Sequence, residues 1–360
     1  MFKQKQLSVF LSIIVASAVS GPTWAQDSSS KVDIETYGHL NIGYMNGDTG
    51  DGSESYIVDN DNSASRVGAK LSGYVDELGM TVGVHAELEY QQNASNLVTS
   101  ENRSIDGDFN ERQLNVFAQG GFGKVSLGQG DGAANGNIER DLSGTNVVSF
   151  ANPALIGGAL SFIDRGAGDE VALKSAMSDQ DFESRYDRLR YDAPSLGPVD
   201  LSVSQGVKGN DDVTEVGGRV SVPFAGKLAA GLGYSVKDVG GATGDVTTAG
   251  GSVSWLHSTG ISLTGAFSRI EDDDSTNPDS DFYLLKLGYK VGKHAFDVHY
   301  AEAEDRAAEG DSADTKGVGY VYTPVKWLNL YAGYNNHSLE RRSGDYEDVN
   351  TVLVGSRLKF

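Results

Sequence analysis

The feature that most constrains the fold of this chain is an alternation of apolar and polar residues that recurs along its length. Residues 80–90 show it best. The even-numbered positions are the apolar residues Met80, Val82, Val84, Ala86, Leu88 and Tyr90. The odd-numbered positions are Thr81, Gly83, His85, Glu87 and Glu89. Because successive side chains of a β-strand point to opposite faces, the pattern predicts a strand with one apolar face and one hydrated face.

The alternation continues to the C-terminus, and the breaks in it are of two kinds. Short connections are expected at 76–79, 121–123, 195–198, 224–226, 258–260, 292–293 and 326–327. Longer acidic connections alternate with them, at 46–61, 240–245, 271–280, 304–314 and 340–348. Short turns at one end and long loops at the other are typical of barrels that span an outer membrane.

About sixteen strands of roughly 9–13 residues fit between these breaks, and about 10 tilted residues cross an apolar layer about 25 Å tall. Strands of globular proteins are shorter, at about 5–6 residues. We therefore predict an all-β chain that forms a transmembrane antiparallel β-barrel of about 16 strands. A barrel of that size encloses water, whereas about eight strands leave an interior filled by side chains.

The N-terminus has the features of an export signal. Lys3 and Lys5 precede a mostly apolar segment at 7–19, and the small residue Ala25 offers a cleavage position. The apolar segment is shorter than the roughly 20 residues of a membrane-spanning helix. We predict a cleaved signal peptide at 1–25, a single barrel domain at 26–360, and a location in the cell outer membrane.

Composition excludes several classes of function. Only 39% of the chain is apolar, and it contains no cysteine, so disulfides and thiol chemistry are excluded. After residue 25 no run of 18 apolar residues occurs, which excludes helical membrane spans. Without Lys3 and Lys5, 27 of the 29 basic residues remain against 50 acidic ones. This excess of negative charge argues against nucleic acid as a partner.

One long segment, from about 130 to 184, interrupts the strand rhythm. An insert of that length without secondary structure is uncommon in a compact domain. In a barrel it has space inside the wall, so we expect a long loop folded into the lumen.

Five short segments lie in a fixed order along the chain. They are YGHLNIGY at 37–44, SRVGAKLSG at 65–73, RQ at 112–113 continuing to GFGKVSLGQ at 121–129, RLRYDAPSLG at 188–197, and RLKF at 357–360. Together they resemble the general, non-specific porin family of the Gram-negative outer membrane, and the resemblance covers nearly the whole chain after the signal peptide. It implies a homotrimer of sixteen-stranded barrels, each narrowed by an inward loop whose acids face a basic wall.

Strand parity supports part of that basic wall. Arg66 shares a parity with Lys70, and Arg188 with Arg190, opposite apolar neighbours. An arginine facing lipid costs about 2–4 kcal/mol at mid-bilayer, so these cations should face the lumen. For Arg112 and His39 the placement rests on the resemblance. The predicted basic wall consists of Arg66, Arg112, Arg188, Arg190, His39 and Lys70.

The acidic half of the constriction is less defined. The candidate loop acids are Asp131, Glu139, Asp141 and Asp164. The family often has Pro-Glu-Phe-Gly-Gly in this loop, whereas the nearest match here, NPALIGG at 152–158, lacks the carboxylate. Which acid opposes the arginines therefore stays open, as does the preference for anions or cations. A solvated position in the loop is the alternative for each acid.

The resemblance also implies partners. The terminal Phe360 resembles the family's signal for the outer-membrane assembly machinery. Lipid bilayer and lipopolysaccharide are the expected surroundings. No cofactor or metal is predicted, because the acidic runs at 59–62 and 271–274 lack the spacing of a calcium loop.

The resulting hypothesis is a channel for passive diffusion of small polar solutes and ions. A substrate-selective channel, a structural or adhesive barrel, and a soluble exported β-protein remain as alternatives. An enzyme is not predicted, because no Gly-x-Ser-x-Gly motif accompanies the six histidines.

Overall fold

The structure of the chain is a computed structural model, which describes residues 32–240, 244–274 and 276–360. The expected signal peptide at 1–25 lies outside the described residues. No helix within the described part of the chain is both long enough and apolar enough to cross a membrane.

The described residues form mostly long strands. The strands of the wall are β1 (Val32–Asp48), β3 (Arg66–Val75), β4 (Met80–Gln91), β5 (Asp108–Gly120), β6 (Gly123–Asp131), β9 (Arg185–Asp192), β10 (Val199–Lys208), β11 (Asp211–Pro223), β12 (Gly226–Asp238), β13 (Asp245–His257), β14 (Ile261–Asp272), β15 (Ser280–Val291), β16 (His294–Glu304), β17 (Ser312–Val325), β18 (Leu328–Arg341) and β20 (Val349–Lys359). The shorter elements are β2 (Ser53–Asp59), η1 (Asp61–Ser63), η2 (Pro153–Leu155), β7 (Ser161–Ile163), β8 (Glu170–Ala172), α2 (Leu173–Ala176) and β19 (Gly344–Asp345).

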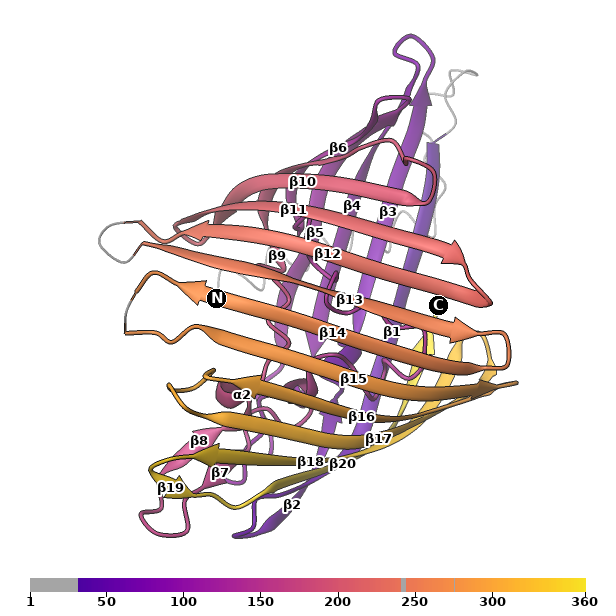
Figure 1. The fold of residues 1–360 in the computed structure, drawn as a ribbon. Helices are drawn as coiled ribbons and strands as arrows, with labels where there is room; N and C mark the ends of the chain where they lie inside the picture. Colours follow the sequence, from indigo (N-terminus) through magenta and orange to yellow (C-terminus); the bar gives the residue numbers. More distant parts are fainter. Residues whose placement is uncertain (1–31, 241–243, 275) are drawn as a thin grey trace.

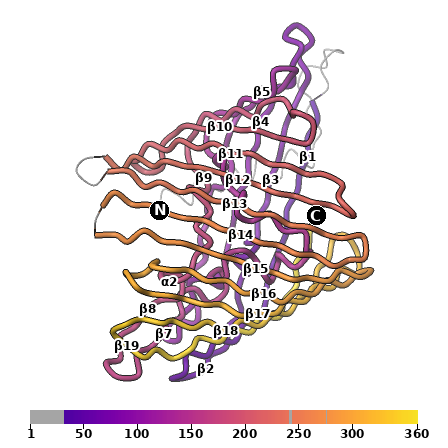
Figure 2. The backbone as a smooth tube through the Cα atoms, viewed as in Figure 1, coloured from indigo at the N-terminus to yellow at the C-terminus, as the bar shows by residue number. Residues whose placement is uncertain are grey.

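Every wall strand pairs antiparallel with its neighbours, and the last strand closes the sheet on the first. β20 runs beside β1 from Asn350 opposite Asp48 to Lys359 opposite His39. Phe360 and Gly38 then exchange two backbone hydrogen bonds of 3.0 and 3.1 Å. The described residues thus form a closed antiparallel barrel of 16 strands, which confirms the predicted fold class. Figures 1 and 2 show β10–β18 crossing in front of β1, β3 and β4.

The alternation in the sequence becomes an inside and an outside. On β15, Leu285 is 57% exposed on the outer face, whereas its neighbour Lys286 is only 1% exposed on the lumen side. On β4, Val82 and Val84 are exposed while Glu87 is buried. Apolar side chains outside and polar ones inside reverse the distribution of a soluble protein. The outer face therefore suits lipid.

The connections follow the predicted rhythm. Short turns join β3 to β4, β5 to β6, β9 to β10, β11 to β12, β13 to β14, β15 to β16 and β17 to β18. The other end of the barrel carries the longer loops, with one exception, because β10 and β11 are separated only by Gly209 and Asn210. The first residues of β1 and the last residues of β20 lie at the short-turn end.

The long insert occupies 132–184, between β6 and β9, and lies inside the wall. We call it the lumen loop. It contains η2, β7, β8 and α2, of which Figure 1 shows β7, β8 and α2 near the long-loop ends of β16–β18. Its apolar residues, such as Leu160 and Phe162, join inward wall residues such as Met45 and Phe282 in one buried cluster. The loop is therefore packed against the wall as a core, and it occupies part of the lumen.

Replacing Leu285 by Arg should lower the free energy of unfolding of the bilayer-embedded barrel by about 2–4 kcal/mol, because a guanidinium would then face lipid. Urea unfolding in lipid vesicles measures this. The apolar variant Leu285→Phe is the control and should change the value by less than about 1.5 kcal/mol. Equal stability of Leu285→Arg and the parent would show that this face does not contact lipid.

Candidate functional site

A cavity of about 410 Å³ lies between the wall and the lumen loop. We call it the basic cavity. Its lining is almost entirely polar. The lining residues are His85, Gln113, Asn115, Lys124, Ser126, Asp131, Asn135, Gly136, Arg140, Arg188, Arg190, Asp192 and Arg219.

Most of these cations lie on nearby strands, where every second side chain faces the lumen. On β9, Arg188 and Arg190 point inward, while Leu189 and Tyr191 are exposed on the outer face. Two strands further along the wall, Arg219 of β11 has the same orientation. The lumen loop adds Arg140. With Lys124 of β6, cations from four parts of the sequence therefore converge on one cavity.

Backbone carbonyls and amides hold these guanidinium groups in place. Arg188 donates from Nη1 to the carbonyl of Gly128 at 2.7 Å and from Nε to that of Asp131 at 3.0 Å. Arg219 donates from Nε to Oδ1 of Asn137 at 2.6 Å. Neutral acceptors fix the geometry of an arginine but leave its positive charge uncompensated.

Carboxylates are few in this cavity. Arg190 forms an ion pair with Asp192 at 2.7 Å. Asp131 lies 3.7 Å from Arg185. The described residues place no carboxylate within ion-pair distance of Lys124, Arg140, Arg188 or Arg219. Five cationic side chains against two carboxylates give the cavity a positive potential, which attracts anions in a confined pore.

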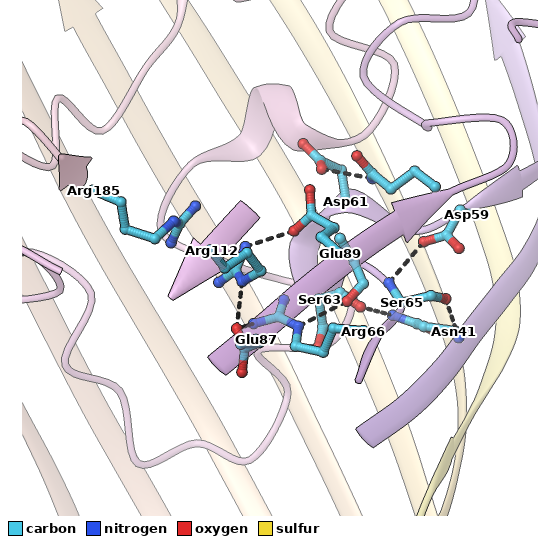
Figure 3. A network of polar contacts seen from close by, with 12 residues as sticks. Asn41, Asp59, Asp61, Ser63, Ser65, Arg66, Glu87, Glu89, Arg112 and Arg185 are labelled. Carbon is cyan, nitrogen blue, oxygen red and sulfur yellow. Dashed lines mark hydrogen bonds and ion pairs between the residues drawn. The ribbon is translucent and has the colours of Figure 1, made fainter. Parts of the chain in front are cut away.

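A second charged group lies on the adjacent strands β3, β4 and β5 (Figure 3). Arg112 donates to Glu87 and to Glu89, each at 2.6 Å. Arg66 lies 3.6 Å from Glu87. We call these four side chains the charge ladder. Two carboxylates compensate two guanidinium groups here, so the ladder is close to neutral, unlike the basic cavity.

A β-bulge brings Arg112 into this ladder. Glu87 pairs with Gln113, but the next residue of β4, Leu88, pairs with Glu111, so Arg112 has no opposite residue. Strict alternation with the outward Leu114 would turn Arg112 toward lipid. The extra residue shifts the phase of β5 and turns the guanidinium inward. This bulge explains why sequence parity alone did not place Arg112.

His39 and Lys70 lie on the same side of the barrel but do not line the basic cavity. His39 Nε2 is 2.9 Å from the carbonyl oxygen of Ala64. The Lys70 ammonium lies 5.5 Å from the centroid of the Tyr37 ring. Of the six predicted wall cations, the structure thus brings Arg188 and Arg190 together in the cavity, and Arg66 and Arg112 in the ladder.

The predicted loop acids serve different contacts. Of the four, only Asp131 lines the basic cavity, and it is the last residue of strand β6, not a residue of the lumen loop. Asp141 forms a buried ion pair with Lys286 of β15 at 2.8 Å, which fastens the lumen loop to the wall. Burial opposes ionisation of Asp141, but Lys286 and hydrogen bonds from Ser143 outweigh it and hold the pKa of Asp141 below its ordinary value. Asp164 accepts from the backbone N–H of Asp345 at 2.9 Å, among the long loops.

Glu139 belongs to a buried carboxyl group with Asp179 and Asp181. Asp181 accepts backbone N–H groups of Gly136 at 2.6 Å and Ile138 at 3.2 Å, which ties the two arms of the lumen loop together. Burial, followed by the neighbouring carboxylates, raises the pKa of Glu139 well above its ordinary value. Burial and the charge of Asp181 raise the pKa of Asp179 to about 7. Burial also raises the pKa of Asp181, to about 6.

Sequence reasoning missed several residues of this site: Lys124, Arg140, Arg219 and Lys286. Lys286 carries a usable signal, since it lies between Leu285 and Leu287 in its strand, and Arg219 a weaker one, since only Val220 beside it is apolar. Their partners lie far away in the sequence, so parity shows that they face inward but not what they meet.

Comparison with known proteins agrees with this architecture. The sequence matches the family model described as Gram-negative porin over residues 12–341. No curated protein sequence matches it significantly.

Solved structures show the same fold at low identity. The anion-selective porin from Comamonas acidovorans aligns with a TM-score of 0.66 and 19% identity, covering 92% of this chain and 100% of that one. The outer membrane channel DcaP of Acinetobacter baumannii gives 0.59 and 15%, covering 91% and 97%. The trimer form of OmpT from Vibrio cholerae gives 0.56 and 17%, covering 91% and 99%.

Replacing Lys286 by Met should lower the free energy of unfolding by about 3–5 kcal/mol, because Asp141 would remain buried without its partner. The double variant Lys286→Met/Asp141→Asn should recover most of that loss. Urea unfolding in lipid vesicles measures all three proteins. Additive losses in the double variant would show that the two side chains do not act as a pair.

The carboxyl group around Asp179 should make the lumen loop pH-sensitive. A carboxyl whose pKa is raised in the folded loop stabilises that loop fully below about pH 4, and the stabilisation is lost as pH rises through about 6–7. Hydrogen exchange of residues 178–184 should therefore be slower at pH 5 than at pH 8, after correction for the intrinsic rate.

Asp179→Asn removes one titrating group and should keep the slow exchange at pH 8. Asp169→Asn, at an exposed position of the same loop, is the control and should exchange like the parent. Identical protection of the parent protein at both pH values would contradict the prediction.

Proposed function

The chain belongs to the Gram-negative porin family, and we propose that it forms a water-filled channel through which small hydrophilic solutes and ions diffuse passively. Family and fold place it in the outer membrane as a channel. The proposed transport is passive and needs neither a catalytic group nor a cofactor.

The observation that carries the proposal is the basic cavity inside a closed barrel. A polar cavity of about 410 Å³ between the wall and the lumen loop suits small hydrated solutes. Its cationic excess favours anions over cations. The description of the Comamonas acidovorans structure as an anion-selective porin is consistent with this preference.

A substrate-selective anion channel is the second candidate, and one observation favours it. β9 carries three arginines, Arg185, Arg188 and Arg190, and the cavity adds Arg140 and Arg219. Such a density of arginines can bind an anion as well as attract it, because guanidinium groups recognise carboxylate and phosphate in a bidentate manner. Saturation of anion flux at rising concentration would separate this candidate from free diffusion.

We also propose that the barrel assembles as a homotrimer in a bilayer containing lipopolysaccharide, and that Phe360 is read by the assembly machinery. The trimer form of the Vibrio cholerae protein supports the first point. The position of Phe360 at the seam between β20 and β1 makes the residue part of barrel closure.

In planar bilayers with a KCl gradient, the refolded protein should conduct with a reversal potential of the sign that indicates preference for chloride. The double variant Arg188→Gln/Arg219→Gln should reduce the chloride-to-potassium permeability ratio by about threefold or more, because it removes two fixed cations from a narrow pore.

The matched control is Lys293→Gln/Lys326→Gln, which removes two exposed cations from short turns and should leave the ratio close to that of the parent. A folded protein without conductance would defeat the channel proposal. A reversal potential favouring potassium would defeat the anion preference alone.

A further inference from the structure

The charge ladder and the basic cavity lie at different depths of the same wall. β4 begins at a short turn and runs toward the long-loop end, passing His85 before Glu87 and Glu89. His85 lines the basic cavity, whereas Glu87 and Glu89 do not. Glu87 also pairs directly with Gln113, which lines the cavity, so the ladder adjoins the cavity on its long-loop side.

The two carboxylates of the ladder hold fixed positions. Glu87 accepts from Nε of Arg112 at 2.6 Å and from the hydroxyl of Tyr37 at 2.7 Å. Glu89 accepts from Nη1 of the same Arg112 at 2.6 Å. Both glutamates are mostly buried, so solvent screens these contacts only weakly.

Further charged groups surround the ladder. Figure 3 shows Arg185 reaching toward Arg112 from the start of β9. Asp61 accepts from Gln91 at 2.8 Å, and Asp59 accepts from the backbone N–H of Ser65 at 3.1 Å. These two carboxylates lie on the loop side of the ladder in Figure 3. Arg357 also reaches this group and donates to the Ser63 hydroxyl at 2.8 Å, so the cations around the ladder match its carboxylates, whereas the adjoining cavity is positive.

The balance depends on wall acids, not on acids of the lumen loop. Glu139 and Asp141, the loop acids nearest in sequence to Arg140, are occupied by buried contacts away from the ladder. If Glu87 and Glu89 were neutral, Arg66 and Arg112 would add two uncompensated cations above the basic cavity.

We propose that Glu87 and Glu89 of β4 are the specificity-determining acids of the channel: by compensating Arg66 and Arg112, they limit the preference for anions. This inference rests on the proposed channel function and names the residues that tune it. The ladder region of the pore is then close to neutral, and the adjoining cavity is cationic. The ion selectivity depends on how far the ladder carboxylates reduce the total positive charge of the pore.

The test is the reversal potential of two ladder variants and one control variant in planar bilayers under a KCl gradient. Glu87→Gln/Glu89→Gln keeps the side-chain size and most hydrogen-bonding positions while removing both charges. It should raise the chloride-to-potassium permeability ratio by about threefold. Arg112→Gln removes the bridging cation and should shift the ratio toward potassium. Glu77→Gln, at an exposed short turn, is the matched control and should leave the ratio unchanged.

The reversal potential should shift in opposite directions in the two ladder variants, and this distinguishes a role in selectivity from a role in stability alone. If the ladder only held the wall together, all ladder variants would increase current noise or lose conductance without opposite shifts of the reversal potential, and the inference would be overturned. An unchanged ratio in a conducting Glu87→Gln/Glu89→Gln channel would also overturn it, while the proposed function would stand. A silent parent protein would instead defeat the proposed function.

Discussion

Closure of the sheet is the constraint on which the rest of this structure depends. Hydrocarbon offers no hydrogen-bond partner to a backbone N–H or C=O, so a strand edge cannot face lipid. The pairing of β20 with β1, completed by the exchange between Gly38 and Phe360, removes that edge. Once the sheet is closed, each residue of a strand faces either lipid or the lumen, and the period of two in the sequence assigns the side.

Closure also determines what stabilises the interior. A barrel of 16 strands is too wide to be filled by its own wall residues, and here the lumen loop fills part of the space. The first arm of the loop is fastened to β15 by the Lys286–Asp141 ion pair and to β11 by Glu215, which accepts from the backbone N–H of Ala134 at 2.9 Å. The charges that fasten the loop are thereby withdrawn from the lumen, which leaves the arginines of β9 and β11 to determine its potential.

Sequence alone could predict the barrel and the inward direction of Arg66, Arg188 and Arg190, because these follow from local alternation. It could not predict the fate of the loop acids. Asp141 meets Lys286, which lies 145 residues away, and no local pattern encodes that distance. Of the predicted acids, Asp131 faces Arg185, and the other described ion pairs of this part of the wall join neighbouring strands, where Arg112 meets Glu87 and Glu89. The alternation of β4 places both glutamates on the inward face. It does not place their partner Arg112, because the β-bulge shifts the alternation of β5 by one residue.

The shift of the inside–outside alternation at this bulge has an evolutionary consequence. In a wall where every side chain faces lipid or water, adding or removing a single residue reverses all positions up to the next turn. The bulge at Arg112 confines such a reversal to one end of β5, so that Phe109 and Leu114 both face outward although their numbers differ in parity. A barrel of this kind can therefore acquire or lose a lumen charge through a one-codon insertion or deletion, without any substitution of the residue that carries the charge.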